Sequence, residues 1–168
     1  MICSLVRMRP RWINRLPGEV RDSLSLERGE HVLAHAVTRD GSYAVATGVA
    51  LHLPGPKRVP WERIEHAQWE NGWLHVREVG GSAEHHLRLA EPGALPGIVQ
   101  ERVTATIVFS HHDTLPGGGG VRIVGRRSTS GSELRWAFVF DAGLDPADPG
   151  LLAQAEQVLE NLRRQTGL

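Results

Sequence analysis

Histidine is the residue type in this sequence with the most potential for metal or acid–base chemistry, because nine are present and imidazole is a common metal ligand. His31 and His35 stand four residues apart in EHVLAH, which is the spacing of the zinc-binding pair in H-E-x-x-H. Val32 stands where that motif requires glutamate. In a strand, the two histidines would share a face with Leu33 between them, which is too long a spacing for comfortable chelation. We therefore interpret this segment as an ordinary half-exposed strand.

The other paired histidines are adjacent in the sequence, at His85-His86 and His111-His112. Adjacent side chains in a strand point to opposite faces, so neither pair has ligand spacing. Cys3 is the only cysteine, which excludes an internal disulfide and a zinc site with two or four cysteine ligands. These observations predict a protein that needs no metal and no other cofactor.

Other motifs for catalysis or ligand binding are incomplete. The run GGGG at 117–120 lacks the Lys-Ser/Thr that follows in a P-loop and lies between two expected strands, so we interpret it as a flexible hairpin tip. Asp141, Asp145 and Asp148 lack the spacing of an EF-hand calcium loop. The sequence contains no Gly-x-Ser-x-Gly nucleophile motif. We predict no catalytic residues, and an enzyme is the least supported class.

The charge balance argues against one class of partner. The formal net charge is 0, from 19 basic and 19 acidic residues, whereas a general nucleic-acid-binding protein needs a basic surface. All the basic residues except Lys57 are arginine. Arginine suits anion recognition, but the codon preference of a GC-rich genome explains the same bias more simply.

The length of 168 residues suits one well-packed domain or two very small ones. The mean hydropathy of −0.25 is typical of a soluble globular protein. The longest mostly apolar run, AVATGVALHL at 44–53, is too short to span a bilayer. The first residues lack the apolar core of a signal peptide, so we expect a cytoplasmic protein.

The N-terminal half predicts a dense β region after an arm and a short helix. Residues 1–16 carry arginines without an apolar period, and LPGEVRDSL (16–24) is consistent with one or two helical turns. HVLAHAVT (31–38) and SYAVAT (42–47) flank Asp40-Gly41, which is a hairpin signal. A further strand candidate, VALHL (49–53), ends at the breaker PGP.

The stretch VPWERIEHAQWENGWLHV at 59–76 has two interpretations. As a helix, it would begin near Pro60 and end at Asn71-Gly72, and Trp69 would lie on the solvated side. As a hairpin, it would turn at Asn71-Gly72, because these residues supply the positive φ angles of a type I′ turn. The second arm would continue through WLHVREV (73–79), and EHHLRL (84–89) would follow as a further strand. The local pattern favours the hairpin.

The C-terminal part predicts a helix, three strands and a second helix. The helical period at Leu95, Ile98, Val99 and Val103 precedes three strand candidates: TATIVFSHH (104–112), VRIVGRR (121–127) and LRWAFVFD (134–141). The last helix is expected after Asp145-Pro146, with Asp145 as its N-cap. We expect Trp61, Trp73 and Trp136 to pack in the core. The chain thus divides into residues 1–25 (arm and short helix), 26–103 (β region with a helix) and 104–168 (three strands plus a helix), packed as one globular unit.

Residues 31–103 resemble bacterial pleckstrin-homology-like (PH-like) domains, including GRAM-type relatives. The resemblance is carried by AVATGVALHL, by RVPWERIEHAQWENGWLHV with Arg58, Val59, Pro60, Trp61 and Ile64 at the family's positions, and by the strand ending in HLRL before a helix. Small actinobacterial proteins of unknown function look similar along nearly the whole length. The resemblance implies a strongly bent antiparallel sheet or split barrel with a capping helix. The C-terminal βββα unit at 104–168 lies outside the resemblance, and with it the expected fold class is α+β. The resemblance also implies that 59–76 is a hairpin, and it implies no set of catalytic residues.

The function expected from this resemblance is a non-enzymatic interaction module that binds a protein or peptide along a strand edge or beside the helix. The alternative is a carrier that holds a small molecule or lipid in an apolar cup of the bent sheet. We expect no nucleic-acid partner and no stable membrane association.

If the fold is PH-like, an anionic ligand would bind near Arg39 in the first hairpin loop, with Lys57 and Arg58 approaching from a neighbouring loop. Three cations offset by Asp40 attract an anionic membrane weakly, because each contributes only about 1 kcal/mol. We therefore predict no retention on anionic vesicles in co-sedimentation at physiological salt. Clear retention that is lost when Arg39, Lys57 and Arg58 are all replaced by alanine would contradict this.

Overall fold

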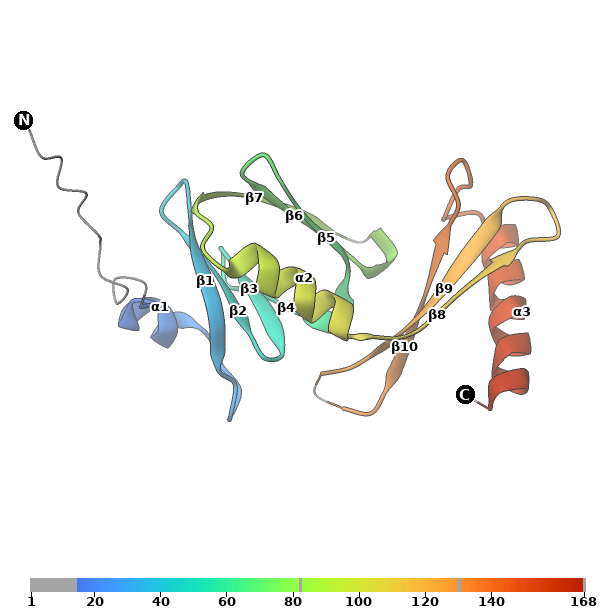
Figure 1. Cartoon of the computed structure of the whole chain (residues 1–168), viewed down its shortest axis with the longest axis horizontal. Helices are drawn as coiled ribbons and strands as arrows, with labels where there is room; N and C mark the ends of the chain where they lie inside the picture. Colours follow the sequence, from blue (N-terminus) through green and yellow to red (C-terminus); the bar gives the residue numbers. More distant parts are fainter. Residues whose placement is uncertain (1–14, 82, 130, 168) are drawn as a thin grey trace, which may run out of the picture.

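The structure is a computed structural model that describes residues 15–81, 83–129 and 131–167. Most of the N-terminal arm expected at 1–16 lies outside the described residues. The described chain forms a seven-stranded antiparallel sheet, a three-stranded antiparallel sheet and three α-helices (Figure 1). The short helix expected at 16–24 is present as α1 (Gly18–Ser23), and none of its residues is buried.

The first sheet consists of seven consecutive strands: β1 (Val32–Thr38), β2 (Tyr43–Thr47), β3 (Ala50–Leu53), β4 (Lys57–Pro60), β5 (Ile64–Glu70), β6 (Trp73–Glu78) and β7 (Glu84–Glu91). Its order is β4-β3-β2-β1-β7-β6-β5. β1 and β7 pair only through Val37 with Glu91 and Thr38 with Leu89, and the register shifts between these pairs. The sheet bends at this short pairing and leaves β4 and β5 as outer strands, so the described residues form an open sheet and not a closed barrel.

The predicted hairpin at 59–76 is confirmed. β5 pairs with β6 in antiparallel register from Ile64 opposite Glu78 to Glu70 opposite Trp73. At the turn, Asn71 has φ 51° and Gly72 has φ 82°, as a type I′ turn requires. The helical alternative survives only as one 3₁₀ turn, η1 (Trp61–Arg63), immediately before β5.

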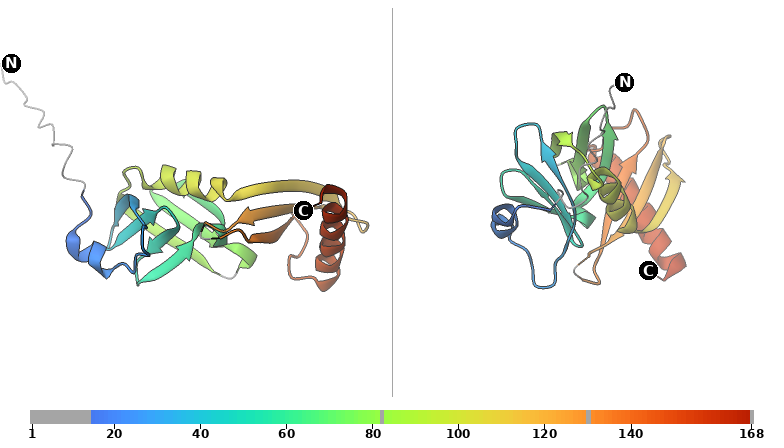
Figure 2. Two further views of the ribbon diagram at one scale, coloured as in Figure 1. Left: turned by 90° about the horizontal axis from the view of Figure 1, so that it is seen from below. Right: turned by 60° about the vertical axis from the view of Figure 1, so that its left-hand side comes forward.

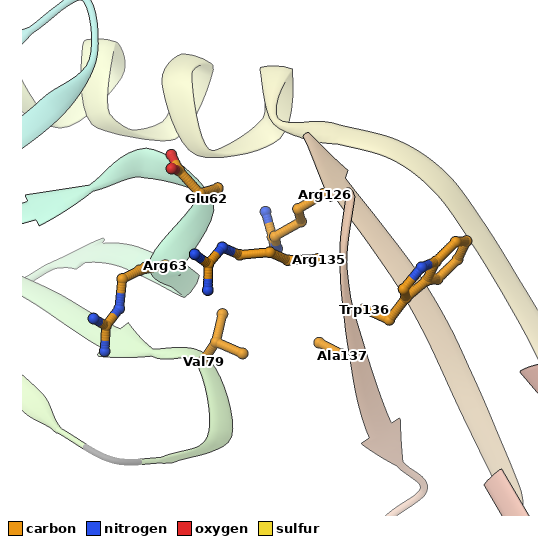
Figure 3. A pocket seen from close by; sticks show the side chains of 7 residues that line it. All are labelled: Glu62, Arg63, Val79, Arg126, Arg135, Trp136 and Ala137. Atoms are coloured by element: carbon orange, nitrogen blue, oxygen red, sulfur yellow. The ribbon is translucent and has the colours of Figure 1, made fainter. Parts of the chain in front are cut away.

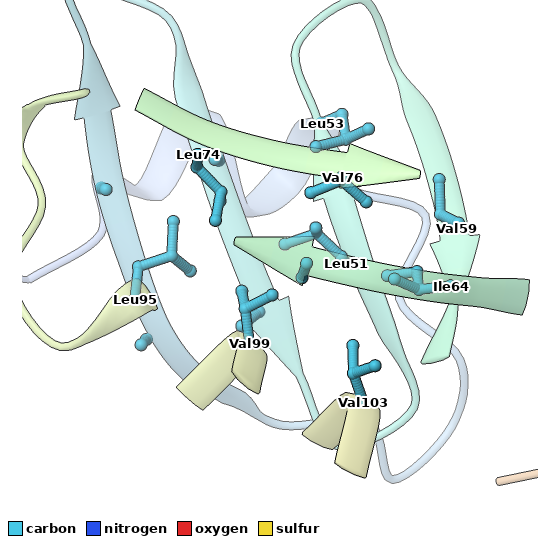
Figure 4. Packing of buried hydrophobic residues seen from close by; sticks show 14 of the residues in the cluster. Leu51, Leu53, Val59, Ile64, Leu74, Val76, Leu95, Val99 and Val103 are labelled. Carbon is cyan, nitrogen blue, oxygen red and sulfur yellow. The ribbon is translucent and has the colours of Figure 1, made fainter. Parts of the chain in front are cut away.

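Helix α2 (Leu95–Ala105) covers the concave side of the bent sheet (Figure 4). Its buried residues Leu95, Val99 and Val103 are spaced by four, so they form one stripe. They pack into the main core, whose other large members are Leu51, Leu53, Val59, Trp61, Ile64, Leu74, Val76 and Leu89. The strand expected at 104–112 starts later, at Ile107, because α2 continues to Ala105 and Thr106 Oγ1 donates to Val103 O at 2.7 Å.

The second sheet has the order β10-β9-β8 and consists of β8 (Ile107–Thr114), β9 (Gly120–Arg127) and β10 (Leu134–Phe140). The glycine run forms the tip of the β8–β9 hairpin as expected, with positive φ at Gly118 and Gly119. Helix α3 (Pro149–Thr166) packs on one face of this sheet and forms a separate core around Leu115, Val121, Ile123, Ala155 and Leu159. Figures 1 and 2 show the two sheets side by side along the long axis, with α3 on the far side of the second sheet.

The prediction of Asp145 as the N-cap of the last helix is wrong. The helix is capped by Asp148, whose Oδ1 accepts from Gly150 N at 2.7 Å and from Leu151 N at 3.3 Å. Asp145 Oδ1 instead accepts from Ala147 N at 2.9 Å in the preceding turn. Asp-Pro occurs twice in this stretch, and the second occurrence precedes the apolar stripe that begins at Leu151.

The three tryptophans expected in the core differ in their environments. Trp61 is fully buried, and its Nε1 donates to Thr47 O at 3.0 Å. Trp136 packs against the second core, and Trp73 is half-buried with the Arg88 guanidinium 5.6 Å from its ring centre. In the described part of the chain, no helix has the length and apolar character needed to cross a membrane.

We predict that Gly72→Ala lowers the free energy of unfolding by about 1 kcal/mol, because alanine is strained at positive φ. A Cβ at Gly72 would meet no atom within 4 Å, so the effect isolates backbone strain. Gly48→Ala is the matched control, since that position also has open space but no positive φ. Urea denaturation of both variants measures the difference, and equal stability of the two would contradict the turn assignment.

Candidate functional site

The two sheets are joined by the side chain of Arg126 on β9, which is only 4% exposed. Its Nη1 donates to Val103 O at 3.1 Å and to Thr106 Oγ1 at 2.8 Å, both at the C-terminal end of α2. Its Nη2 donates to Glu65 O on β5 at 2.8 Å. One guanidinium therefore holds together a helix, a strand of the first sheet and a strand of the second.

A second set of contacts connects the β9–β10 loop to η1. The buried Glu62 carboxylate accepts from Ser128 Oγ at 2.9 Å and from Thr129 Oγ1 at 3.2 Å. Thr129 Oγ1 also lies 3.1 Å from Val49 O. Together with Arg126, these bonds fix the C-terminal unit against the bent sheet.

Between these contacts lies a cavity of about 290 Å³, which we call the arginine cleft. It is lined by Glu62, Arg63, Val79, Arg126, Arg135, Trp136 and Ala137 (Figure 3). Arg135 on β10 stands directly opposite Arg126 on β9 in the strand register. Arg63 reaches the cleft from η1, on the other side. Three guanidinium groups and one carboxylate thus line the same space.

Few carboxylates balance these arginines. Arg63 Nη2 lies 3.7 Å from Glu78 Oε2, while the Arg135 side chain forms no hydrogen bond or ion pair with the described residues. Arg126 has no carboxylate within ion-pair distance among the described residues, and its buried Nε has no hydrogen-bond partner. Burial lowers the pKa of Arg126 and the Glu65 carboxylate partly offsets this, but a guanidinium stays charged in proteins. The cleft therefore carries excess positive charge.

The nearby Glu78 carboxylate is buried and contacts three basic side chains. It lies 2.8 Å from Lys57 Nζ and 2.9 Å from His85 Nε2, besides its contact with Arg63. The hydrogen bonds from Lys57 and then His85 lower the pKa of Glu78, against the effect of burial. Lys57 is thus committed to an internal partner.

Glu30 is a second buried carboxylate with several partners. It accepts a hydrogen bond from Thr47 Oγ1, and it lies 3.2 Å from His52 Nε2 and 3.8 Å from Arg58 Nη2. Arg58 Nη2 also lies 2.9 Å from Glu27 Oε1. Burial, the largest single influence, raises the pKa of Glu30, but the bonds from Thr47, the Glu27 backbone and His52, with the Arg58 charge, leave it lowered.

The three candidate anion-binding residues from the sequence are not brought together by the contacts of the described residues. Lys57 pairs with Glu78 and Arg58 with Glu30, on opposite faces of β4 because neighbouring side chains alternate. Arg39 lies in the turn after β1, where its backbone N donates to Arg88 O at 2.8 Å. The sequence patterns did not identify the arginine cleft, although the alternation in 134–141 does place Arg135 and Ala137 on one face.

A second candidate surface is a groove between β5 and α2, which we call the β5–α2 groove, with a volume of about 480 Å³. Its lining residues are His66, Ala67, Gln68, Trp69, Leu74, Pro96, Gly97 and Gln100. β5 is an outer strand of the sheet. Trp69 is 39% exposed, which is unusual for so large an apolar side chain.

Two of the contacts made by histidine side chains join only two residues each. His75 Nδ1 and His86 Nδ1 are 2.7 Å apart on neighbouring strands, and His112 Nε2 is 3.0 Å from Asp141 Oδ1. Across the described ranges, no group of three or more His, Cys, Asp or Glu residues is arranged to hold a metal ion.

The chain matches no protein-family model, no curated protein and no solved structure. Its function is therefore inferred from the geometry of its own residues.

We predict that the two buried carboxylates make stability depend on acidity. Both have a folded pKa below the ordinary value of 4.5, so their contribution is complete above pH 4.5 and is lost as pH falls through the folded values. Glu30→Gln and Glu78→Gln should each lower the free energy of unfolding at neutral pH by about 3 kcal/mol. They should also flatten its decline as the pH is lowered from neutral through and below 4.5.

Urea denaturation across this pH range measures the effect. Glu133→Gln is the matched control, because Glu133 is exposed and forms no ion pair with the described residues. Variants at Glu30 and Glu78 with the same pH slope as the control would contradict the assignment.

Proposed function

We propose that the chain is a PH-like interaction module without enzymatic activity, which binds an extended protein segment in the β5–α2 groove. The observation that carries this proposal is an exposed tryptophan, Trp69, on an outer strand that runs beside a helix. The PH-like assignment is supported by the seven-stranded bent antiparallel sheet and by α2 packed on its concave side.

The outer edge of β5 offers backbone groups for pairing. β5 pairs with β6 on one side and has no strand on the other within the described residues. Arg126 already occupies Glu65 O, so the stretch from His66 onward is the part open to an added strand. An extended segment laid along it would gain main-chain hydrogen bonds, and side-chain pockets would supply specificity.

The walls of the groove suit an apolar side chain of that segment. Ala67 and Trp69 share one face of β5, where Ala67 is buried in the core and Trp69 extends beyond it. On the opposite wall, Pro96 and Gly97 present little side-chain bulk. An aromatic ring beside a shallow apolar surface is a typical anchor point in protein interfaces.

The alternative function, a small molecule or lipid held in the concave side of the sheet, has less geometric support. Leu95, Val99 and Val103 of α2 fill that side and are almost fully buried (Figure 4). A ligand bound there would have to displace α2 from the core. The geometry favours a peptide ligand at the edge.

Selection of a displayed random peptide library against the folded protein tests the proposal. We expect enriched peptides that are extended, carry an apolar anchor and bind with a saturable isotherm in calorimetry. Trp69→Ala should weaken that binding about thirtyfold or more, because tryptophan anchors contribute about 2 kcal/mol or more. Gly97→Gln should also weaken it by filling the groove, and it should fold normally because a Cβ at Gly97 meets no atom within 4 Å.

Leu33→Ala is the matched control, since Leu33 is another exposed apolar residue, on β1. It should bind the selected peptides like the unchanged protein. Peptides that bind Trp69→Ala and Gly97→Gln with unchanged affinity, or a library with no enrichment, would contradict the proposal.

A further inference from the structure

The arginine cleft is separate from the β5–α2 groove, since the two share no lining residue. We propose that this cleft binds a small organic anion through a phosphate or carboxylate group held by Arg63 and Arg135, with Arg126 behind them. The inference does not depend on the peptide-binding function.

The first argument is the pairing of like charges. Arg126 and Arg135 are directly opposite each other on antiparallel strands, so their side chains leave the sheet on the same face. Like charges in such a pair destabilise the sheet unless an opposite charge lies between or beside them. Figure 3 shows Arg135 extending from β10 toward η1 beside Arg126, while the Arg63 side chain, which also lines the cleft, runs from η1 toward the lower left of the view. An anion in the cleft would remove the repulsion.

The second argument is the shortage of negative charge. Arg126 is satisfied by two carbonyl oxygens and one hydroxyl, and its buried Nε has no hydrogen-bond partner. Arg63 is the most distant of the three cations around the Glu78 carboxylate: it lies 3.7 Å away, whereas Lys57 lies 2.8 Å and His85 2.9 Å away. Only Glu62 brings a negative charge to the lining itself, so three cations face one carboxylate.

Glu62 is also unavailable to pair closely with the arginines. Its two oxygens accept from Ser128 Oγ and Thr129 Oγ1 in the β9–β10 loop, and no arginine nitrogen lies within 4.0 Å of it among the described ion pairs. Its position fixes the loop, and the remaining charge of the cleft is positive. An incoming oxyanion would meet guanidinium groups that bind phosphate and carboxylate in bidentate fashion.

The third argument concerns the size and character of the ligand. The cleft adjoins a second cavity of about 500 Å³, which shares Val79, Trp136 and Ala137 with it. The second cavity is lined further by apolar side chains, including Val139, Phe140 and Leu152, and by Glu65 and Arg77, whose charges pair with each other at 3.1 Å. A charged pocket that opens onto an apolar one suits a ligand with an anionic end and an apolar or ring-shaped part, rather than an inorganic ion.

The test uses phenyl phosphate, benzoate, inorganic phosphate and the neutral compound benzyl alcohol as probes of the whole protein. Binding is followed by the side-chain Nε–Hε resonances of arginine and by the melting temperature. We expect saturable shifts of Arg63 and Arg135 with phenyl phosphate or benzoate, a raised melting temperature, and binding of inorganic phosphate about tenfold weaker than phenyl phosphate. Benzyl alcohol should cause neither change.

Arg135→Gln is the decisive variant, because Arg135 is exposed, forms no contact that holds the fold, and should fold normally when changed. It should weaken phenyl phosphate binding about tenfold or more, since a hydrogen bond to a charged group contributes about 1.5–3 kcal/mol. Arg122→Gln is the matched control: it removes the same charge from an exposed position on β9 outside the cleft. Trp69→Ala should leave the anion binding unchanged.

Three results would overturn the proposal: no saturable shift up to about 10 mM phenyl phosphate or benzoate, equal affinity in Arg135→Gln and Arg122→Gln, or benzyl alcohol binding as tightly as phenyl phosphate. Equal affinity for inorganic phosphate and phenyl phosphate would overturn the assignment of an organic ligand. Loss of binding in Arg135→Gln with retention in Trp69→Ala would support the anion site, whatever the peptide experiment shows.

Discussion

The buried guanidinium of Arg126 is the interaction on which the arrangement of the two sheets depends. A charge that is taken out of water must be surrounded by fixed polar partners, or its desolvation costs several kcal/mol. Here those partners are carbonyl and hydroxyl oxygens at the C-terminal end of α2 and a carbonyl on β5. The end of a helix concentrates unpaired carbonyls and partial negative charge, so it suits a buried cation. If the second sheet rotated away from α2, the buried Arg126 guanidinium would lose these hydrogen-bond partners.

The same rule, applied at Glu30 and Glu78, explains which cations remain open to a ligand. Each of these buried carboxylates contacts a histidine and a basic residue of β4. The β4 residue is Arg58 for Glu30 and Lys57 for Glu78. The β4 end of the molecule therefore balances its charges internally. At the arginine cleft, positive charge remains in excess. The carbonyl oxygens that bind Arg126 carry no full negative charge, so nothing there offsets the neighbouring charge of Arg135.

Local patterns in the sequence were sufficient for most of the fold. Asn71-Gly72 fixes a hairpin turn through its own backbone preferences, and the alternation in 134–141 and the period of Leu95, Val99 and Val103 identify buried faces without knowledge of their partners. Two Asp-Pro pairs carry the same capping signal, so the choice between Asp145 and Asp148 depended on where α3 packs. The arginine cleft could not be predicted, because it needs the β9–β10 register and the approach of η1 from more than 60 residues away. Likewise, nothing local to Lys57 reveals that Glu78 lies against it.

The arginine cleft and the β5–α2 groove are mechanically connected through Arg126, although the two share no lining residue. One wall of the groove is β5, which Arg126 holds at Glu65, and the groove begins at the next residue, His66. The other wall is α2, which Arg126 holds at Val103, two turns after Pro96 and Gly97. A helix and a paired strand transmit position along their length with little change, since both are hydrogen-bonded at every turn or pair. The spacing of the two groove walls is therefore held by the core packing of α2 against the sheet and, at one end, by the Arg126 guanidinium. The C-terminal unit thus supplies one of the residues that fix the width of a surface on the N-terminal sheet.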